Sequence, residues 1–195
     1  MFISHDEWKG LDIFHPDDVY QDWTTLEWYD YYRYKHHYAE VISKAENILE
    51  LGVRLGYSAF AFLSSRHCRT YTGLDIQLPL DGGMNFKTFD WVAEKVFAKF
   101  PAVETALIEM NSQTDPWPAS KYDLIHIDGD HSLEGALKDC KQAWDILVPG
   151  GLMIVDDYTF IPEVALAVDQ FLATENIPKI IGYSKRGDCL MFKPL

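Results

Sequence analysis

The sequence predicts an α/β fold: a doubly wound, mostly parallel sheet covered by helices, preceded by an N-terminal helical segment. Three observations lead to this fold class. From residue 47 onward, short apolar segments alternate with segments of helical periodicity, the pattern of βαβ units. Three of the apolar segments end in glycine or acidic residues near positions 52, 75 and 128. Two late strand-like segments, 179–183 and 189–192, are separated by a polar loop at 184–188, which predicts a hairpin and an antiparallel edge strand.

The first 45 residues differ from the rest by their aromatic content, and they form the first expected unit. Trp28, Tyr31, Tyr32, Lys35 and Tyr38 share one helical face, which predicts a helix over 24–43. Two interpretations stay open. The helix packs on the sheet or on a second copy of the chain, giving a homodimer through Trp28 and Tyr32, or it is a lid whose rings line a substrate pocket.

The remaining residues, 46–195, are expected to form one domain. Predicted strands span 47–51, 70–75, 105–110, 124–128 and 152–155, followed by the two late segments. Predicted helices span 57–65, 89–100, 133–147 and 162–172, and Ser132 is placed to cap the third of them. In the strand over 124–128, His126 is expected to be buried or shielded by a cofactor and to have no role, and in the helix over 133–147 Asp139 is expected to lie on a solvated face.

Composition excludes several classes of protein. The 195 residues carry a net charge of −13, which argues against nucleic acid as a partner. The three cysteines show no CxxC spacing and fit reduced thiols of a cytoplasmic protein. The start of the chain has neither a basic segment nor a long apolar run, so neither a signal peptide nor membrane insertion is expected.

The ends of the first two predicted strands indicate a cofactor site. Gly52 and Gly56 allow close approach of the backbone, but the third glycine of a dinucleotide fingerprint is missing. Glu50 would repel a pyrophosphate and instead suits the ammonium group of an amino acid moiety. Asp75 is placed to accept hydrogen bonds from two ribose hydroxyls. An adenosine joined to an amino acid is S-adenosylmethionine.

The segment ELGVRLGYS at 50–58 resembles motif I of class I S-adenosylmethionine-dependent methyltransferases, and its ending is similar to the catechol and caffeoyl-CoA O-methyltransferase branch. The segments IHIDGDHSLEG at 125–135 and LVPGGLMIVDDY at 147–158 resemble bacterial small-molecule relatives. The resemblance covers 46–195 and implies a Rossmann-like sheet of seven strands, the last antiparallel. It also implies that Tyr57 and Ser58 lie at the methionine end of the cofactor, and that Asn111 and Ser112 lie near the adenine.

A second group of residues indicates a reaction centre. Asp128, Asp156 and Asp157 follow two strands that can be neighbours, and converging carboxylates suit Mg²⁺ or a similar hard cation. The resemblance places a metal-binding Asp at Asp128 and an Asp-Asn pair at 156–157, so Asp157 replaces an asparagine. Asp128 would also touch the cofactor. His131 falls where the family has a lysine base, and it could take the proton from the substrate or bind the metal.

The resulting expectation is metal-assisted O-methylation of a small molecule that carries a hydroxyl group. Two rivals remain. One, disfavoured by the three acids and His131, is a non-catalytic subunit that keeps the fold for binding or scaffolding. The other, disfavoured by Glu50 and the missing glycine, is a nicotinamide-dependent oxidoreductase. A separate alternative concerns the acids alone: Asp128 only touches the cofactor, and Asp156 and Asp157 cap the following helix region.

Overall fold

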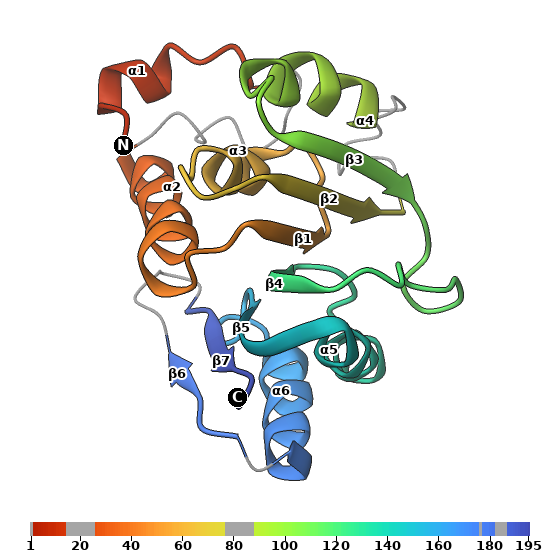
Figure 1. Ribbon diagram of the computed structural model, residues 1–195. Helices are drawn as coiled ribbons and strands as arrows, with labels where there is room; N and C mark the ends of the chain where they lie inside the picture. Colours follow the sequence, from red (N-terminus) through yellow and green to blue (C-terminus); the bar gives the residue numbers. More distant parts are fainter. Residues whose placement is uncertain (1, 15–25, 77–87, 176, 182–186) are drawn as a thin grey trace.

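The structure is a computed structural model that describes residues 2–14, 26–76, 88–175, 177–181 and 187–195. Its centre is a seven-stranded sheet of order β3-β2-β1-β4-β5-β7-β6 (Figure 1). Strands β1 to β5 pair in parallel, and β7 runs antiparallel to both β5 and β6. This is the predicted doubly wound, Rossmann-like sheet with an antiparallel strand near its edge.

The bounds of the elements agree closely with the predicted ones. The strands are β1 (Asn47–Leu51), β2 (Thr70–Asp75), β3 (Glu104–Glu109), β4 (Tyr122–Ile127), β5 (Leu147–Val155), β6 (Ile180–Ile181) and β7 (Cys189–Phe192). The helices of the sheet domain are α3 (Tyr57–Leu63), α4 (Thr88–Trp91), α5 (Leu133–Ile146) and α6 (Pro162–Glu175). Residues 92–99 continue α4 as a π turn, η3 (Val92–Val96), and a 3₁₀ turn, η4 (Phe97–Lys99). Most of the predicted hairpin loop, 184–186, lies outside the described residues.

Strand β5 begins five residues earlier than predicted. The residues before the predicted start include Pro149-Gly150-Gly151, a sequence typical of a turn, but Gly150 N–H donates to the Lys193 carbonyl at 2.8 Å and Lys193 N–H donates to the Gly151 carbonyl at 2.9 Å. The C-terminal segment after β7 therefore extends the ladder and holds these residues in strand geometry.

The N-terminal segment is helical, as predicted, and starts with a short helix that the periodicity did not reveal. Helix α1 (His5–Lys9) begins with a capping box, in which Ser4 and Glu7 exchange side-chain to backbone hydrogen bonds. Helix α2 (Leu26–His37) continues as a π turn, η2 (Tyr38–Ile42), and the predicted residues 24 and 25 lie outside the described chain.

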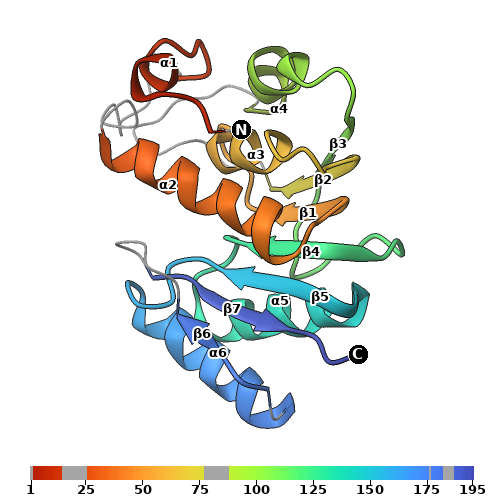
Figure 2. The ribbon, with the colours of Figure 1, turned by 60° about the vertical axis from the view of Figure 1, so that its left-hand side comes forward.

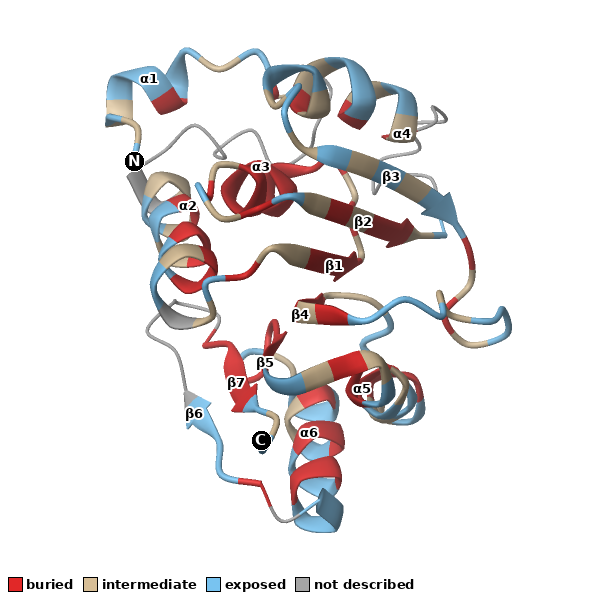
Figure 3. Cartoon of the chain, in the orientation of Figure 1, coloured by how far each residue is buried: buried red, intermediate tan, exposed pale blue. Residues whose placement is uncertain are grey.

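Two hydrophobic clusters, one on each face, bury the sheet. Because side chains alternate along a strand, Ile48 points to the face covered by α2, α3 and η3, whereas Leu49 points to the face covered by α5 and α6. Figures 1 and 2 show these helices on opposite sides of the sheet. Strands β1, β4 and β7 are largely buried, while the edge strand β3 is mostly exposed (Figure 3).

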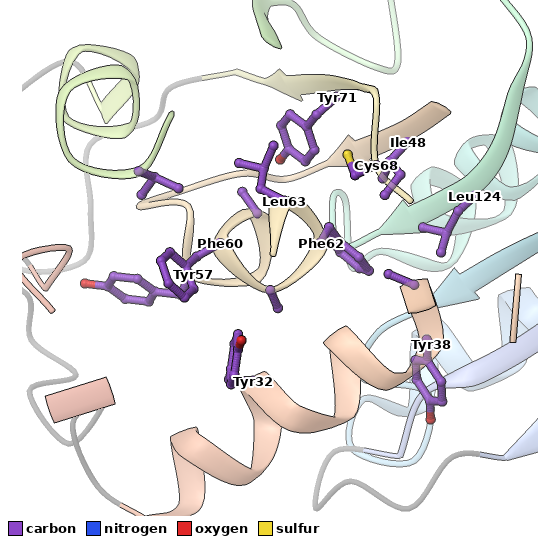
Figure 4. Packing of buried hydrophobic residues seen from close by; sticks show 14 of the residues in the cluster. Tyr32, Tyr38, Ile48, Tyr57, Phe60, Phe62, Leu63, Cys68, Tyr71 and Leu124 are labelled. Atoms are coloured by element: carbon purple, nitrogen blue, oxygen red, sulfur yellow. The ribbon is translucent and has the colours of Figure 1, made fainter. Parts of the chain in front are cut away.

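Helix α2 is part of the first cluster. The Tyr32 ring is fully buried and lies 5.7 Å from the Phe60 ring of α3 and 5.1 Å from the Trp8 ring of α1 (Figure 4). Tyr32 is thus a core residue of this chain and does not offer a dimer surface. No helix in the described part of the chain combines the length and the apolar character needed to cross a bilayer.

Candidate functional site

The site lies where the strand order reverses, at the carboxyl ends of β1 and β4. Backbone hydrogen bonds continue the sheet past these ends: Asp128 N–H donates to Leu51 at 2.8 Å, and Asp156 N–H donates to Ile127 at 2.9 Å. Such a switch point leaves a crevice between neighbouring loops. The sheet therefore brings the glycine loop, Asp128 and the acidic pair after β5 side by side, as the sequence predicted.

Gly52 and Gly56 are needed for the shape of the glycine loop. Gly52 has φ of +86°, and a Cβ there would lie 1.8 Å from the Asp128 carbonyl oxygen. Gly56 has φ of +78° and starts α3. Only a residue without a side chain can pass so close to the β4 loop in the left-handed conformation.

Asp75 holds this loop. Its Oδ2 atom accepts hydrogen bonds from the backbone N–H groups of Val53 and Arg54, both at 2.8 Å. The carboxylate thus stands beside the loop, at the predicted position. Its expected contact with a ribose remains a prediction.

The loop and helix α2 enclose a pocket. Four predicted residues line it, Gly52, Tyr57, Ser58 and Asp128, together with the Tyr31 ring from α2 and the loop residues Val53, Arg54 and Leu55. The lid interpretation of the aromatic segment stays a prediction. Helix α2 packs on α3, and one of its rings forms a wall of the pocket.

Glu50 differs from the expectation that it faces an ammonium group. Its side chain is fully buried, and it accepts hydrogen bonds from the hydroxyls of Ser58 and Tyr71 and lies 2.9 Å from His126 Nδ1. These contacts occupy both carboxylate oxygens and turn them away from the pocket. In this structure Glu50 supports the pocket wall through Ser58 and does not form part of its surface.

The candidate cation cluster consists of Asp128, His131 and Asp157, whose ligating atoms all lie within 4.8 Å of one another. His131 Nε2 is 3.1 Å from Asp128 Oδ1 and 4.0 Å from Asp157 Oδ2. The hydrogen bond to Asp128 raises the pKa of His131, against the effect of its burial. Two carboxylates and an imidazole suit Mn²⁺, Fe²⁺ or Zn²⁺ better than they suit Mg²⁺, because an imidazole nitrogen is not a preferred ligand of Mg²⁺.

Asp156 departs from the predicted ligand set. Its carboxylate points into the protein, where Oδ2 accepts a hydrogen bond from the Tyr31 hydroxyl at 2.9 Å and lies 3.5 Å from Lys35 Nζ. Although burial opposes its charge, Lys35 lowers the pKa of Asp156. Asp156 is thus an ionised partner of the N-terminal helix, while Asp157 faces the cluster.

Lys35, Asp188 and His126 complete a buried polar group that the sequence did not reveal. Lys35 Nζ is 2.8 Å from His126 Nε2 and donates to Asp188 Oδ2 at 2.9 Å. Burial and the charge of Asp156 raise the pKa of Asp188 well above its ordinary range. A signal existed in the sequence: Lys35 shares the aromatic face of its helix, where a charged residue needs buried partners.

The loop after β3 carries the residues expected near an adenine. Asn111 Oδ1 accepts from Gln113 N–H at 2.8 Å, and Ser112 is mostly buried. Gln113 Nε2 in turn donates to Asp139 Oδ1 at 2.7 Å. Asp139 is fully buried between this loop and the β4–α5 loop, so its expected place on a solvated face was wrong.

Comparisons with known proteins agree with this arrangement. The sequence model of a family described as "Methyltransferase domain" matches residues 49–158. No curated protein matches the sequence.

Solved structures share the fold at low sequence identity. A methyltransferase from Pyrococcus furiosus is 16% identical, with a TM-score of 0.66 over 95% of this chain and 90% of that one. The SAH-bound methyltransferase PaMTH1 from Podospora anserina is 18% identical, with a TM-score of 0.63 over 96% and 85%. The O-methyltransferase from Bacillus cereus in complex with SAH is 18% identical, with a TM-score of 0.57 over 84% and 79%.

Proposed function

This chain belongs to the methyltransferase domain family that matches its residues 49–158, and from that premise we propose that it transfers a methyl group from S-adenosylmethionine to a hydroxyl group of a small molecule. One observation carries the proposal. Asp128 lines the pocket formed by the glycine loop and is also a member of the cation cluster. A cofactor in the pocket would therefore lie directly beside the groups that can act on an acceptor.

The pocket suits the methionine end of the cofactor. Its lining residues are those of the glycine loop together with Tyr31, Tyr57, Ser58 and Asp128. The solved structures with SAH support the choice of this cofactor, because they share the fold. Asp75, beside the loop, is proposed to bind the ribose.

The reaction is an in-line displacement at the methyl carbon. The hydroxyl oxygen of the acceptor forms the new C–O bond, the C–S bond of the sulfonium breaks, and the hydroxyl proton leaves. A divalent cation held by Asp128, His131 and Asp157 would lower the pKa of the acceptor hydroxyl. Asp128 holds the His131 ring in place through their 3.1 Å contact. His131 Nε2 would serve either as a ligand of the cation, with the hydroxyl proton leaving to water, or, where no cation is bound, as the acceptor of that proton.

Calorimetric titration with S-adenosylhomocysteine, with Mn²⁺ or Mg²⁺ and again with EDTA, tests the proposal. The wild type is expected to bind with a micromolar Kd, whereas Gly52→Ala is expected to lose binding, because its methyl group would collide with Asp128. Gly10→Ala is the matched control. Its Cβ would meet nothing closer than 3.4 Å.

A second measurement separates the enzyme from a non-catalytic binding subunit. Transfer of a labelled methyl group is followed with a panel of phenols, catechols and sugars. Cofactor binding without transfer to any hydroxyl would favour the binding subunit. Failure of the wild type to bind S-adenosylhomocysteine in either buffer would contradict the proposed function.

A further inference from the structure

Lys35 is an unusual residue because the interior of the protein encloses its charge completely. Its side chain is 0% exposed, and it comes from α2, outside the segment that matches the methyltransferase family. Its three N–H groups have three partners: His126 Nε2 at 2.8 Å, Asp188 Oδ2 at 2.9 Å and Asp156 Oδ2 at 3.5 Å. These partners come from β4, from the residue before β7, and from the end of β5.

One line of contacts leads from Lys35 to the pocket through β4. An ammonium group can only donate, so His126 Nε2 accepts from it and the ring carries its proton on Nδ1. That N–H donates to Glu50 Oε1 at 2.9 Å, and the Ser58 hydroxyl donates to the same oxygen. Ser58 lines the pocket. The charge of Lys35 therefore sets the tautomer of His126, and through it the hydrogen bond that His126 donates to Glu50.

A second line leads to the pocket through Asp156. Its Oδ2 atom, which faces Lys35, accepts the hydrogen bond of the Tyr31 hydroxyl at 2.9 Å. The Tyr31 ring lines the pocket, and Lys35 Nζ lies 4.8 Å from the centre of that ring. Both lines thus start at one ammonium group and end at polar members of the pocket wall.

The charge of Lys35 balances that of Asp156, a buried acid whose side chain is 1% exposed. A buried carboxylate that loses its cation either takes up a proton or moves toward water. Either change would alter the acceptor that holds the Tyr31 hydroxyl in place.

We propose that Lys35 is a positioning residue of the transferase site, which sets Tyr31 and Ser58 for the methionine end of the cofactor. The inference rests on the proposed function and deepens it. Lys35 touches neither cofactor nor acceptor. It acts through Asp156 on Tyr31 and through His126 and Glu50 on Ser58, and it makes the N-terminal helix a part of the cofactor site.

The test measures the Kd of S-adenosylhomocysteine by calorimetry, together with the unfolding midpoint of each variant. Lys35→Met alone leaves Asp156 without its cation and Asp188 without its donor, so it is combined with Asp188→Asn, and Asp188→Asn alone is the reference. The double variant is expected to bind at least tenfold more weakly than this reference. Arg33→Met, an exposed position on the same helix, is expected to keep the wild-type Kd.

A double-mutant cycle then distinguishes positioning from a general loss of stability. Tyr31→Phe is expected to weaken binding several-fold in the Asp188→Asn reference but less than twofold once Lys35 is absent, because its partner is already displaced. The inference would be overturned if Tyr31→Phe raised the Kd by the same factor with and without Lys35. It would also be overturned if the Lys35→Met/Asp188→Asn variant folded and kept the Kd of its reference.

Two further variants keep the buried charges intact, in case the Lys35 variants do not fold. Tyr31→Phe and Ser58→Ala each remove one hydroxyl at the end of a line, and each is expected to raise the Kd several-fold. Unchanged Kd values in both would also overturn the inference while the proposed function stands. A wild type that does not bind S-adenosylhomocysteine would instead contradict the proposed function itself.

Discussion

The Tyr31 hydroxyl donates a hydrogen bond to the Asp156 carboxylate at 2.9 Å, across 125 positions of the sequence. This contact joins the aromatic N-terminal helix to the end of β5. It explains why Asp156 does not face the candidate cation cluster, and it fixes Tyr31 of the N-terminal helix at the pocket.

The cation cluster gives a prediction about His131. His131→Ala should weaken Mn²⁺ binding about tenfold or more, because one of three converging ligands is lost. Because the His131 side chain is 42% exposed, its removal should leave the fold intact, and the loss of Mn²⁺ binding would not come from unfolding. Calorimetric titration with Mn²⁺ is the measurement, and His37→Ala, an exposed histidine of α2, is the control. Equal affinity in wild type and His131→Ala would remove His131 from the cluster.

Glu50 gives a prediction about stability. Hydroxyls of Ser58 and Tyr71 and the ring of His126 converge on its two oxygens. Glu50→Gln replaces one acceptor by an NH₂ group that faces donors, and it should lower the free energy of unfolding by about 1–3 kcal/mol. Urea denaturation measures the change. Glu104→Gln, at an exposed position of β3, should change the stability by less than about 0.5 kcal/mol.

Asp139 gives a prediction about pH. Burial raises the pKa of Asp139 from 3.8 to about 6. Between these values the unfolded chain loses the proton first, so the native state is progressively destabilised as the pH rises, and the penalty is complete above pH 6. Between pH 5 and pH 7.5, the free energy of unfolding of the wild type should therefore decrease by about 1 kcal/mol more than that of Asp139→Asn.

Denaturant titrations at a series of pH values check this. The difference between the two slopes is the informative quantity, because it is independent of hydrogen bonds that the asparagine gains or loses at every pH. Parallel pH profiles would show that Asp139 does not titrate in this range.

Tyr32 gives a prediction about the N-terminal segment. Its ring is fully buried among Trp8, His36 and Phe60. Tyr32→Ala should lower the free energy of unfolding by about 3–5 kcal/mol, the usual cost of emptying an aromatic core position. Val41→Ala, at a position that is 58% exposed, is the control. A change of oligomeric state without loss of stability would restore Tyr32 as a dimer contact.

Much of the fold could be predicted from the sequence because it depends on local patterns. Alternating β and α segments, Ser132 as a helix cap and the glycines at 52 and 56 each act over a few residues. The parallel sheet then brings the ends of β1, β2 and β4 together, so the positions of Asp75 and Asp128 followed from the strand boundaries alone.

The directions of the buried charges could not be predicted in this way. Whether Glu50 and Asp156 face the pocket or the interior depends on partners far along the chain, and those partners are His126, Lys35 and Tyr31. The same holds for Asp139. Its position on the helix predicted an exposed side chain, but Gln113 and the neighbouring loop cover this side chain.

The sequence by itself determined the sheet, the glycine loop and the family, because these depend on periodicity, backbone freedom and motifs that lie within short segments. Only the tertiary structure decided which acids face the candidate cation cluster and which are buried partners of Lys35. The physical reason is that a buried charge is stable only beside its partner, and the partners of Glu50, Asp156 and Asp188 come from segments that the fold alone brings together.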